Sequence, residues 1–335
     1  MEIATVPVNY VKAMLASAVR NGCDGSSLLD QAGIAEELLA TEKARVPATK
    51  FVQLSHDVMD LLQDENRGFL ERTSRPGTFD MMCYACIHRP TLGQFLRRGI
   101  DFYHIVSDCY DLQLTVDGDL ATYTLTPKAG MVDPDHFMLL CLQAIVHRLS
   151  CWLIGQNLGL QVVNFTHPRP AHANDYNLLF RSPIRFDQPD NSLVFSANKL
   201  DLPNLQNEES LEKFLTLPSL ALMSLPDYET SLLDRIRLMI KGNVGGEFPE
   251  IEAIAERLNL TPATLRRRLR HEGSSYQKIK DDIRRDTAIY LLGSGARSIE
   301  QVAEDIGFNE PTSFYRAFRR WTGVTPRDYV KRTAG

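Results

Sequence analysis

A duplicated segment near the carboxyl end of the chain constrains the fold more than any other feature of the sequence. Ile251–Leu258 and Ile299–Ile306 share one pattern of apolar and charged residues, at an offset of 48 residues. In each copy apolar residues recur at helical spacing, the pattern then breaks, and a second amphipathic segment with several arginines follows. The duplication therefore predicts two units, each made of a helix, a tight turn and a second helix.

The residues at the two breaks agree with this interpretation. The first copy breaks at Asn259-Leu260 and restarts at Thr261-Pro262, where threonine can cap a helix and proline suits a first turn that needs no amide donor. The second copy breaks at Gly307, since glycine readily adopts the left-handed conformation that ends many helices. Its next helix is expected to begin near Glu310-Pro311.

In both units the second helix has an apolar face and a basic face. We expect Leu265 and Leu269 to be buried in the first unit, and Phe314, Phe318 and Trp321 in the second. The residues on the outward faces are Ala263, Arg266, Arg267 and Arg270 in the first helix and Thr312, Ser313, Arg316 and Arg320 in the second.

These outward faces have the chemistry needed to bind DNA. Arginine can donate two hydrogen bonds to guanine, and small residues permit close approach in the major groove. A helix predicted over Tyr276–Leu292 would hold the two faces roughly 25 to 35 Å apart, about one turn of B-DNA. A single basic cluster is more often a solvated helix face. Here the cluster recurs at the equivalent place of a repeated unit, which favours DNA.

The same region resembles the C-terminal part of the AraC/XylS transcription regulators. The resemblance is carried by Ile299–Phe308, Ser313–Phe318 and Gly323–Tyr329. In that family the second helix of each unit is the recognition helix. By position, this implies DNA contacts for Ala263, Arg266 and Arg267 in the first unit and for Thr312, Ser313 and Arg316 in the second. Because some members carry a larger residue in place of Ala263, this side chain would reach a thymine methyl group at most.

Length and composition predict two domains, because 335 residues with 44% hydrophobic content can bury two cores. The fold we expect is an α+β N-terminal sensor domain followed by an all-α DNA-binding domain with two helix-turn-helix units joined by a long helix. The sensor domain would span residues 1–200, a linker 201–226 and the DNA-binding domain 227–335. Within the last, the helix-turn-helix units would occupy 251–272 and 299–322.

The N-terminal half mixes helical and strand patterns. Two alternating segments flank Asp117-Gly118-Asp119, which predicts a hairpin turn. The expected strands are Tyr110–Val116, Ala121–Leu125, Gln161–Phe165, Ile184–Phe186 and Leu193–Ser196. The expected helices are Val8–Arg20, Pro47–Leu62, Thr91–Val106, Pro134–Gln156 (capped by Asp133), Ala171–Phe180, Ser210–Leu215 and Tyr228–Ile240.

This half resembles the sensor domain of AraC-like regulators of the ornithine-utilisation type. The likeness is carried by Asn164–His167, Tyr176, Pro183–Phe186 and Asn191–Phe195. It implies an effector-binding and dimerising domain but does not identify the effector, since sensors of this family accept amino acids, sugars, aromatic acids or fatty acids.

Polar residues within its apolar helices are candidate ligand contacts. They are His147 and Arg148, and His104 beside Tyr103. Because hydrogen-bonded or surface-facing residues on amphipathic helices are the commoner case, no ligand-binding residue is assigned.

The charge distribution separates the two halves. The whole chain carries a net charge of −5, which by itself argues against a nucleic-acid partner. From Glu247 onward, however, 16 basic residues face 13 acidic ones, whereas the preceding part holds 21 and 29. Local arginine clusters can therefore attract phosphate, while the acidic part limits non-specific binding.

Other classes of protein are disfavoured. The six cysteines suggest reduced core thiols in a chain of this size without a secretory signal, and Cys83–Cys86 with His88 lacks the second ligand pair of a zinc site. Phe137–Ile154 is apolar, but Gln143 and Arg148 in its middle argue against a membrane span. Phosphate-loop, nucleophile-elbow and zinc-protease motifs are missing from the sequence, so we expect neither an enzyme nor a cofactor or metal.

We therefore expect a cytoplasmic, sequence-specific transcription regulator that binds double-stranded promoter or operator DNA under control of a small-molecule effector. The resemblance implies activation, RNA polymerase as a partner and a homodimer. The alternative is that the N-terminal domain is only an oligomerisation or protein-partner module without a small-molecule ligand.

Overall fold

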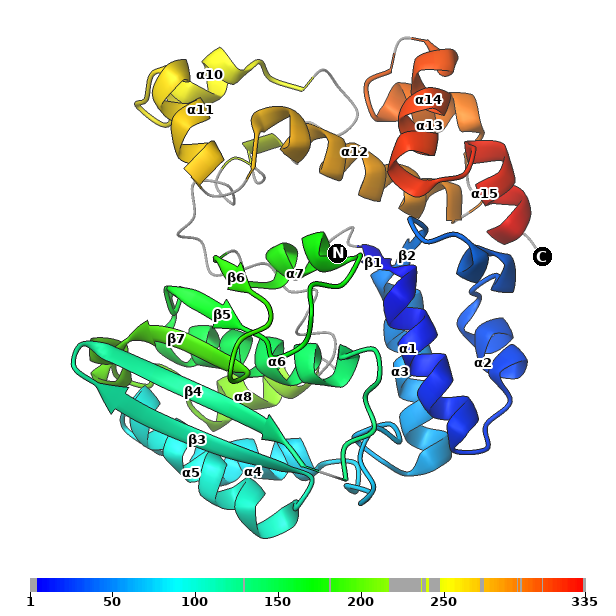
Figure 1. Ribbon diagram of the computed structural model, residues 1–335. Coiled ribbons are helices and arrows are strands. Elements are labelled where there is room, and N and C mark those ends of the chain that lie inside the picture. The colour runs from blue at the N-terminus through cyan, green and yellow to red at the C-terminus, as the bar shows by residue number, and fades with distance from the viewer. Residues whose placement is uncertain are drawn as a thin grey trace. The chain divides into compact units, whose positions relative to one another are not determined.

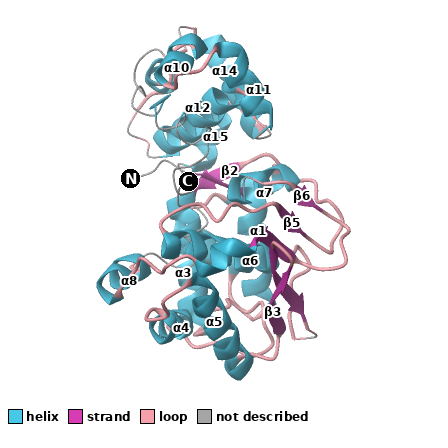
Figure 2. Ribbon diagram, turned by 90° about the vertical axis from the view of Figure 1, so that its left-hand side faces the viewer, coloured by secondary structure: helices cyan, strands magenta, loops and turns pink. Residues whose placement is uncertain are grey.

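The computed structural model describes residues 5–128, 130–180, 182–216, 236, 239–240, 248–271, 274–293, 295, 297–308 and 310–333. The chain forms two compact units (Figures 1 and 2). One combines residues 1–12 and 26–54 with 229–335, and the other combines 13–25 with 55–228. The functional boundaries at residues 200 and 226 stay predictions, and the second lies outside the described residues, as does most of the helix predicted over Tyr228–Ile240.

The unit that contains residues 55–228 is built on a five-stranded sheet with the order β3-β4-β7-β5-β6. All five predicted strands are confirmed. The strands are β3 (Tyr110–Asp117), β4 (Leu120–Pro127), β5 (Val162–Asn164), β6 (Ile184–Arg185) and β7 (Ser192–Ser196). They pair antiparallel except for β5 and β6, which are parallel. The predicted hairpin turn joins β3 to β4, with Gly118 at a φ of 56°.

Helices cover the face of this sheet that carries the buried side chains. Every second residue of β4, namely Ala121, Tyr123 and Leu125, is buried, as expected for a sheet packed on one side. Helix α5 (Leu92–Val106) packs on β3 and α6 (Phe137–Ile154) on β7. The remaining helices are α4 (Thr78–Cys86), α7 (Ala173–Phe180) and α8 (Glu208–Leu215), with a short 3-10 helix at Ala197–Asp201.

The start of α6 differs from the prediction. Helical geometry begins at Phe137, because His136 adopts a left-handed conformation with a φ of 56°. Asp133 still acts as a cap, since its Oδ2 accepts a hydrogen bond of 2.9 Å from the backbone N–H of Leu139.

By length and apolarity α6 is the one helix among the described residues that could cross a membrane, but 78% of it is buried inside the protein, as in a core helix.

The unit that contains residues 229–335 holds the predicted duplication. The first helix pair is α10 (Ile251–Arg257) and α11 (Pro262–His271), and the second is α13 (Ile299–Asp305) and α14 (Pro311–Thr322). The helix α12 (Tyr276–Gly293) runs between the two pairs, and α15 (Pro326–Thr333) follows them (Figure 1). Two helix-turn-helix units joined by a long helix are therefore confirmed.

Segments from the start of the chain complete this unit. Strands β1 (Thr5–Pro7) and β2 (Arg45–Pro47) form an antiparallel pair that packs on α12. The 3-10 helix at Glu36–Ala40 packs on α15. Helix α2 (Gly25–Ala32) belongs almost entirely to this unit, whereas α1 (Val8–Arg20) and α3 (Ala48–Leu62) contribute residues to both units.

A polar network fixes the β1–β2 pair to α12. Arg45 donates to the side-chain and backbone oxygens of Thr5 at 2.8 and 2.9 Å. The Thr5 hydroxyl donates to Asp286 Oδ1 at 2.6 Å, and Arg285 donates to the same oxygen at 2.9 Å. Burial raises the pKa of Asp286, but the charges of Arg285 and Arg45 and the two hydrogen bonds outweigh it and hold the pKa below its usual range. The ionised carboxylate is therefore a stabilising part of the network.

We predict that Asp286→Asn lowers the free energy of unfolding at pH 7 by roughly 1–3 kcal/mol, because it removes a charge-assisted partner from Arg285 and Thr5. A depressed pKa gives stability that is present above the unfolded value near pH 4 and is lost as pH falls further. The difference between variant and wild type should therefore shrink at pH 3. Urea unfolding of the full chain at both pH values measures it.

Glu304→Gln is the matched control for this prediction, because Glu304 is exposed on α13 and its replacement should change stability by less than about 0.5 kcal/mol. An Asp286→Asn protein as stable as the wild type at pH 7 would contradict a stabilising role for the carboxylate.

Candidate DNA-binding surface and effector cavity

Helix α11 has the predicted buried and exposed faces. Leu265 and Leu269 are fully buried in a core that includes Ile254 of α10 and Ile279 of α12. Thr261 caps the helix, because its hydroxyl accepts a hydrogen bond of 3.2 Å from the backbone N–H of Thr264. The predicted contact residues Ala263, Arg266, Arg267 and Arg270 are all exposed.

A hollow on this face brings together part of the predicted set. It is lined by Ala263, Thr264, Arg267 and Arg270, since residues at intervals of three and four lie on one side of a helix. The side chain of Arg266 points toward α10 instead, where its Nη2 lies 3.4 Å from Glu252 Oε1. Thr264 belongs to this face, although the sequence analysis did not single it out.

Helix α14 agrees with the prediction except at one position. Phe314 and Phe318 are fully buried, whereas Trp321 is only partly buried and packs edge-on against Phe308. Ala317 is buried together with Phe314 and Phe318, whereas Trp321 is not, because only the residues that face the neighbouring helices are buried. On the other side Thr312, Arg316 and Arg320 are exposed and Ser313 is partly buried.

The arginines on these two faces differ in how they are held. Arg320 pairs with Asp281 at 3.3 Å, and Arg266 pairs with Glu252 as described above. Exposed pairs of this kind contribute about 0–1 kcal/mol, so both can exchange their partner for a phosphate or a base. Within the described part of the chain, Arg267 and Arg316 have no side-chain hydrogen bond or ion pair.

Arg284 of α12 holds the second helix pair in place. Its Nε donates to the carbonyl of Ile306 at 3.0 Å and its Nη2 to that of Gly307 at 3.3 Å, where α13 ends. The guanidinium carbon lies 4.8 Å from the ring centre of Phe248 and 5.0 Å from that of Phe308. Burial lowers the pKa of Arg284, and Asp281 partly opposes this. One cation therefore contacts the segment before α10 and the turn after α13.

The sequence analysis missed Arg284, although one signal was available. The adjacent arginines Arg284 and Arg285 directly follow the buried Ile283 in a helix that buries several apolar residues. An arginine at such a place commonly pairs with backbone carbonyls or aromatic rings.

We predict that Arg284→Lys weakens the contacts between α12 and the second helix pair. Lysine lacks the planar guanidinium group that donates to two carbonyls and stacks on two rings. The free energy of unfolding should fall by roughly 1–3 kcal/mol. Binding to an operator with two half-sites should weaken more than binding to one half-site. Urea unfolding and gel-shift titration measure the two effects.

Arg327→Lys supplies the matched control, since Arg327 is exposed at the start of α15 and the same exchange should be nearly silent there. Equal effects of both exchanges would show that the contacts of Arg284 contribute nothing specific.

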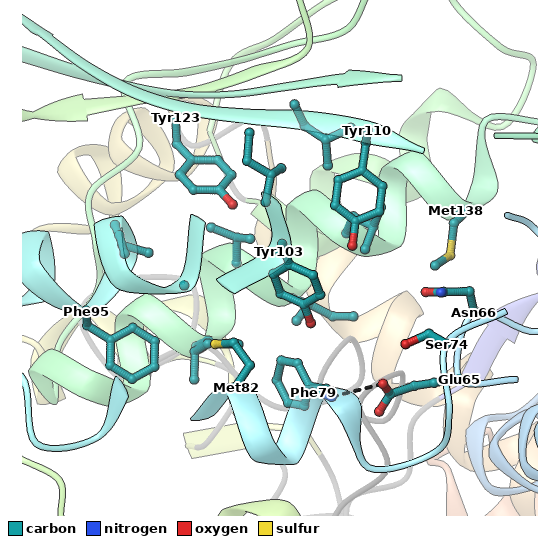
Figure 3. Close-up of a pocket in the computed structure, with 18 of the residues that line it drawn as sticks. Glu65, Asn66, Ser74, Phe79, Met82, Phe95, Tyr103, Tyr110, Tyr123 and Met138 are labelled. Carbon is teal, nitrogen blue, oxygen red and sulfur yellow. Dashed lines mark hydrogen bonds between the residues drawn. The ribbon is translucent and has the colours of Figure 1, made fainter. Parts of the chain in front are cut away.

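The unit that contains residues 55–228 has a partly open cavity of about 90 Å³ between α4, α5, α6 and the β3–β4 hairpin. Apolar and aromatic side chains make most of its wall, and one side carries polar groups (Figure 3). A mostly apolar cavity with a few placed polar groups is typical of small-molecule sites. The polar groups named in Figure 3 are Glu65, Asn66, Ser74, Tyr103, Tyr110 and Tyr123.

Glu65 is the acidic residue of this wall. Its Oε2 accepts a hydrogen bond of 2.9 Å from the backbone N–H of Phe79, in the first turn of α4. Burial raises the pKa of the Glu65 carboxyl to about 7, against the opposing effects of the Phe79 hydrogen bond and the charge of Arg67. The carboxyl group can therefore exchange its proton near neutral pH.

Three tyrosines contribute both ring faces and hydroxyl groups. The rings of Tyr103 and Tyr110 lie 6.0 Å apart, and Tyr123 projects from β4 beside them (Figure 3). Burial raises the pKa of each hydroxyl above its usual value, so all three are uncharged hydrogen-bond donors.

No ligand role was predicted from the sequence for Tyr103, Glu65, Tyr110 or Tyr123. A usable signal for Glu65 was the run Asp64-Glu65-Asn66-Arg67, a dense group of charges directly after a helix. For the tyrosines of β3 and β4, the alternation of the strands predicted a buried face but not a cavity.

The other polar residues considered in the sequence have structural contacts. His104 lies 3.1 Å from Asp111 and accepts the backbone N–H of Leu112. Arg148 donates to the carbonyl of Leu179 at 3.1 Å. His147 is fully buried in α6.

The cysteines of α4 have little tendency to ionise. Cys83 and Cys86 are buried, and burial raises the pKa of both thiols, that of Cys86 to about 11. Because the thiolate is the reactive and metal-binding form, these two residues suit a packing role.

Comparison with known proteins identifies the family. Residues 22–204 match the arabinose-binding domain of AraC transcription regulators, N-terminal part, and residues 254–332 match a helix-turn-helix domain. The first match alone covers more than half of the chain. The protein therefore belongs to the AraC family of DNA-binding transcription regulators, and the predicted resemblance is confirmed.

Individual relatives agree with this assignment. The chain is 28% identical to an ornithine utilization regulator of Pseudomonas aeruginosa over 97% of this chain and 96% of that protein. It is 27% identical to the regulator VqsM of the same species, over 55% and 56%. These relatives are transcription regulators rather than enzymes. Among solved structures, the regulator CdpR of Pseudomonas aeruginosa matches over 96% of this chain and 97% of its own, with 19% identity and a TM-score of 0.32.

Proposed function

We propose that the protein is a sequence-specific, cytoplasmic activator of transcription that seats α11 and α14 in adjacent major grooves of promoter DNA. The observation that carries this proposal is the repeated placement of exposed arginines on the outward faces of two helices joined by α12. The 18 residues of α12 extend about 27 Å at 1.5 Å per residue, which suits helices that enter the groove about one turn apart.

Four of the predicted residues are the strongest candidates for base contacts. Arg267 and Ala263 line the hollow of α11, and Arg316 and Thr312 are exposed on α14. Arg266, Arg270, Ser313 and Arg320 complete the proposed surface. Arg266 and Arg320 form ion pairs with carboxylates. They suit contacts with phosphate, because a phosphate contact does not require one fixed orientation of the side chain.

We predict that Arg267→Ala and Arg316→Ala each weaken operator binding by about 1–3 kcal/mol and relax specificity at one base pair, because each removes a forked contact to a base edge. Gel-shift titration against an operator and its single-base variants at fixed salt measures both effects. The operator itself is first mapped by footprinting the DNA upstream of the protein's own and neighbouring genes.

Arg268→Ala and Arg319→Ala are the matched controls. Both arginines are exposed on the same two helices but lie outside the proposed set, so their loss should reduce affinity slightly and equally for all sequences. If Arg267→Ala and Arg268→Ala have the same effect on every sequence, the arginines of α11 contact only phosphate.

We further propose that a small-molecule effector controls the protein from the cavity beside Glu65, and that RNA polymerase and a second copy of the chain are its protein partners. The mostly apolar cavity with polar groups on one side supports an effector. A ligand that binds the DNA-binding conformation more tightly than other conformations increases the population of that conformation. The size of the increase is set by the difference between the two affinities.

The second candidate is that the N-terminal part serves only to assemble the protein with itself or with a partner. Exposed apolar side chains at the end of α5, Ile105 and Val106, give this alternative a specific surface.

The two possibilities differ in thermal stability. A ligand that binds the native state raises the unfolding midpoint with its concentration, and we predict such a rise for at least one member of a panel of amines, amino acids, aromatic acids and fatty acids. A midpoint that responds only to protein concentration would favour the assembly function and contradict an effector.

A further inference from the structure

The charged residues of the cavity in the unit that contains residues 55–228 lie on one side of it. Three charged residues, Asp64, Glu65 and Arg67, lie at or beside its polar side. Whether they are already satisfied by the protein decides what kind of ligand the cavity can hold, because a buried charge without a partner is costly.

Arg67 is already engaged by the protein. Its Nε donates to the hydroxyl of Ser55 at 2.7 Å, its Nη1 donates to the backbone carbonyl of Glu65, and its Nη2 contacts the sulfur of Met59 at 3.9 Å. The side chain is buried, with 4% of its surface exposed. An anionic ligand would have to displace these contacts in order to use this cation.

Asp64 is satisfied in the same way. Its carboxylate accepts backbone N–H groups from Gly68 at 2.8 Å, Ser74 at 2.7 Å and Asn66 at 3.1 Å. These three bonds occupy both oxygens of the carboxylate. Asp64 therefore maintains the loop and has little capacity left for a ligand.

Glu65 differs from both neighbours. Among the described residues its carboxylate receives backbone N–H groups only, from Phe79 and Gly77, and no lysine or arginine side chain donates to it. Asp80 adds a second negative charge nearby. The Glu65 carboxylate thus lines the cavity and can still accept hydrogen bonds from a ligand. Its pKa is raised because it is buried without a directly bonded cation.

Aromatic rings surround the space that Glu65 borders. Figure 3 shows the hydroxyl groups of Tyr103 and Tyr110 directed toward the side of the cavity that carries Glu65 and Ser74, with the ring of Phe79 beside them. Ring faces attract organic cations, and the attraction grows when water is excluded. A carboxylate together with several aromatic rings is a combination that favours positive charge.

From these contacts we infer that the cavity binds a small organic cation, with its charged nitrogen at Glu65 and its apolar body against Tyr103, Tyr110 and Met138. The inference rests on the proposed effector function and specifies the effector's chemical class. The cavity volume of about 90 Å³ limits the ligand to a small molecule, because one water needs roughly 10–15 Å³ on a comparable measure. A neutral ligand would leave Glu65 to bind a proton, and an anion would be repelled by Glu65 and Asp80.

The test is isothermal titration of the full chain at pH 8 with probes that share one shape and differ in charge. The cations are n-butylammonium and benzylammonium, the neutral analogues n-butanol and benzyl alcohol, and the anions butyrate and benzoate. We expect each cation to bind at least about tenfold more tightly than its neutral or anionic analogue, as for a hydrogen bond to a charged group.

Two variants locate the cation. Glu65→Gln keeps the size and an acceptor oxygen but removes the charge, and should weaken cation binding at least about tenfold. Tyr103→Leu removes a ring face and should weaken it severalfold, so the inference remains testable if Glu65→Gln does not fold. Glu71→Gln is the matched control, because Glu71 is exposed six positions further along the chain, and it should retain wild-type cation binding.

Three results would overturn the inference: equal affinity for the cations and their analogues, cation binding unchanged in both cavity variants, or no binding of either cation. The operator shift assay with the same preparations separates this from the proposed function. Normal operator binding together with any of the three results would reject the cation site and leave the DNA-binding regulator intact.

Discussion

The arrangement of the two helices proposed to bind DNA depends on one partly buried cation on the helix that joins them. Arg284 of α12 lies between the rings of Phe248 and Phe308 and donates to the two carbonyls at the end of α13. These partners come from the segment just before α10 and from the turn after α13, so a single side chain links α12 to both places. Where the guanidinium is removed from water, these partners offset its lost hydration.

The apolar side of α12 adds to this restriction. Ile279 and Ile283 belong to the core of the first helix pair, and the β1–β2 pair is fixed to the same helix through Asp286, Thr5 and Arg45. A straight helix packed along its length does not change the separation of its ends. The protein therefore presents α11 and α14 as one preformed surface, which reduces the entropy that DNA binding must offset.

Features that depend on local sequence were predictable. The turn of the second helix pair follows from Gly307, which has the left-handed φ of 77°, and the hairpin follows from Gly118 between alternating strands. The exposed and buried faces of α11 follow from helical spacing alone. In each case the residues that decide the structure lie within a few positions of one another.

Features that depend on distant partners were not predictable. Glu65 gains its importance from Phe79 and from tyrosines on α5, β3 and β4. Asp286 gains its importance from residues near the start of the chain. The packing of residues 5–7 and 45–47 on α12 could not be inferred from patterns in either segment. Even α6 begins later than predicted, because the Asp133 carboxylate reaches the amide of Leu139 across a left-handed turn at His136.

The most direct test of the account is the affinity of the full chain for its operator after about five base pairs, half a turn of B-DNA, are inserted between the two half-sites. A rigid α12 cannot follow the second half-site to the opposite side of the duplex, so affinity should fall to that for a single half-site. An affinity unchanged by the insertion would contradict a fixed spacing between α11 and α14.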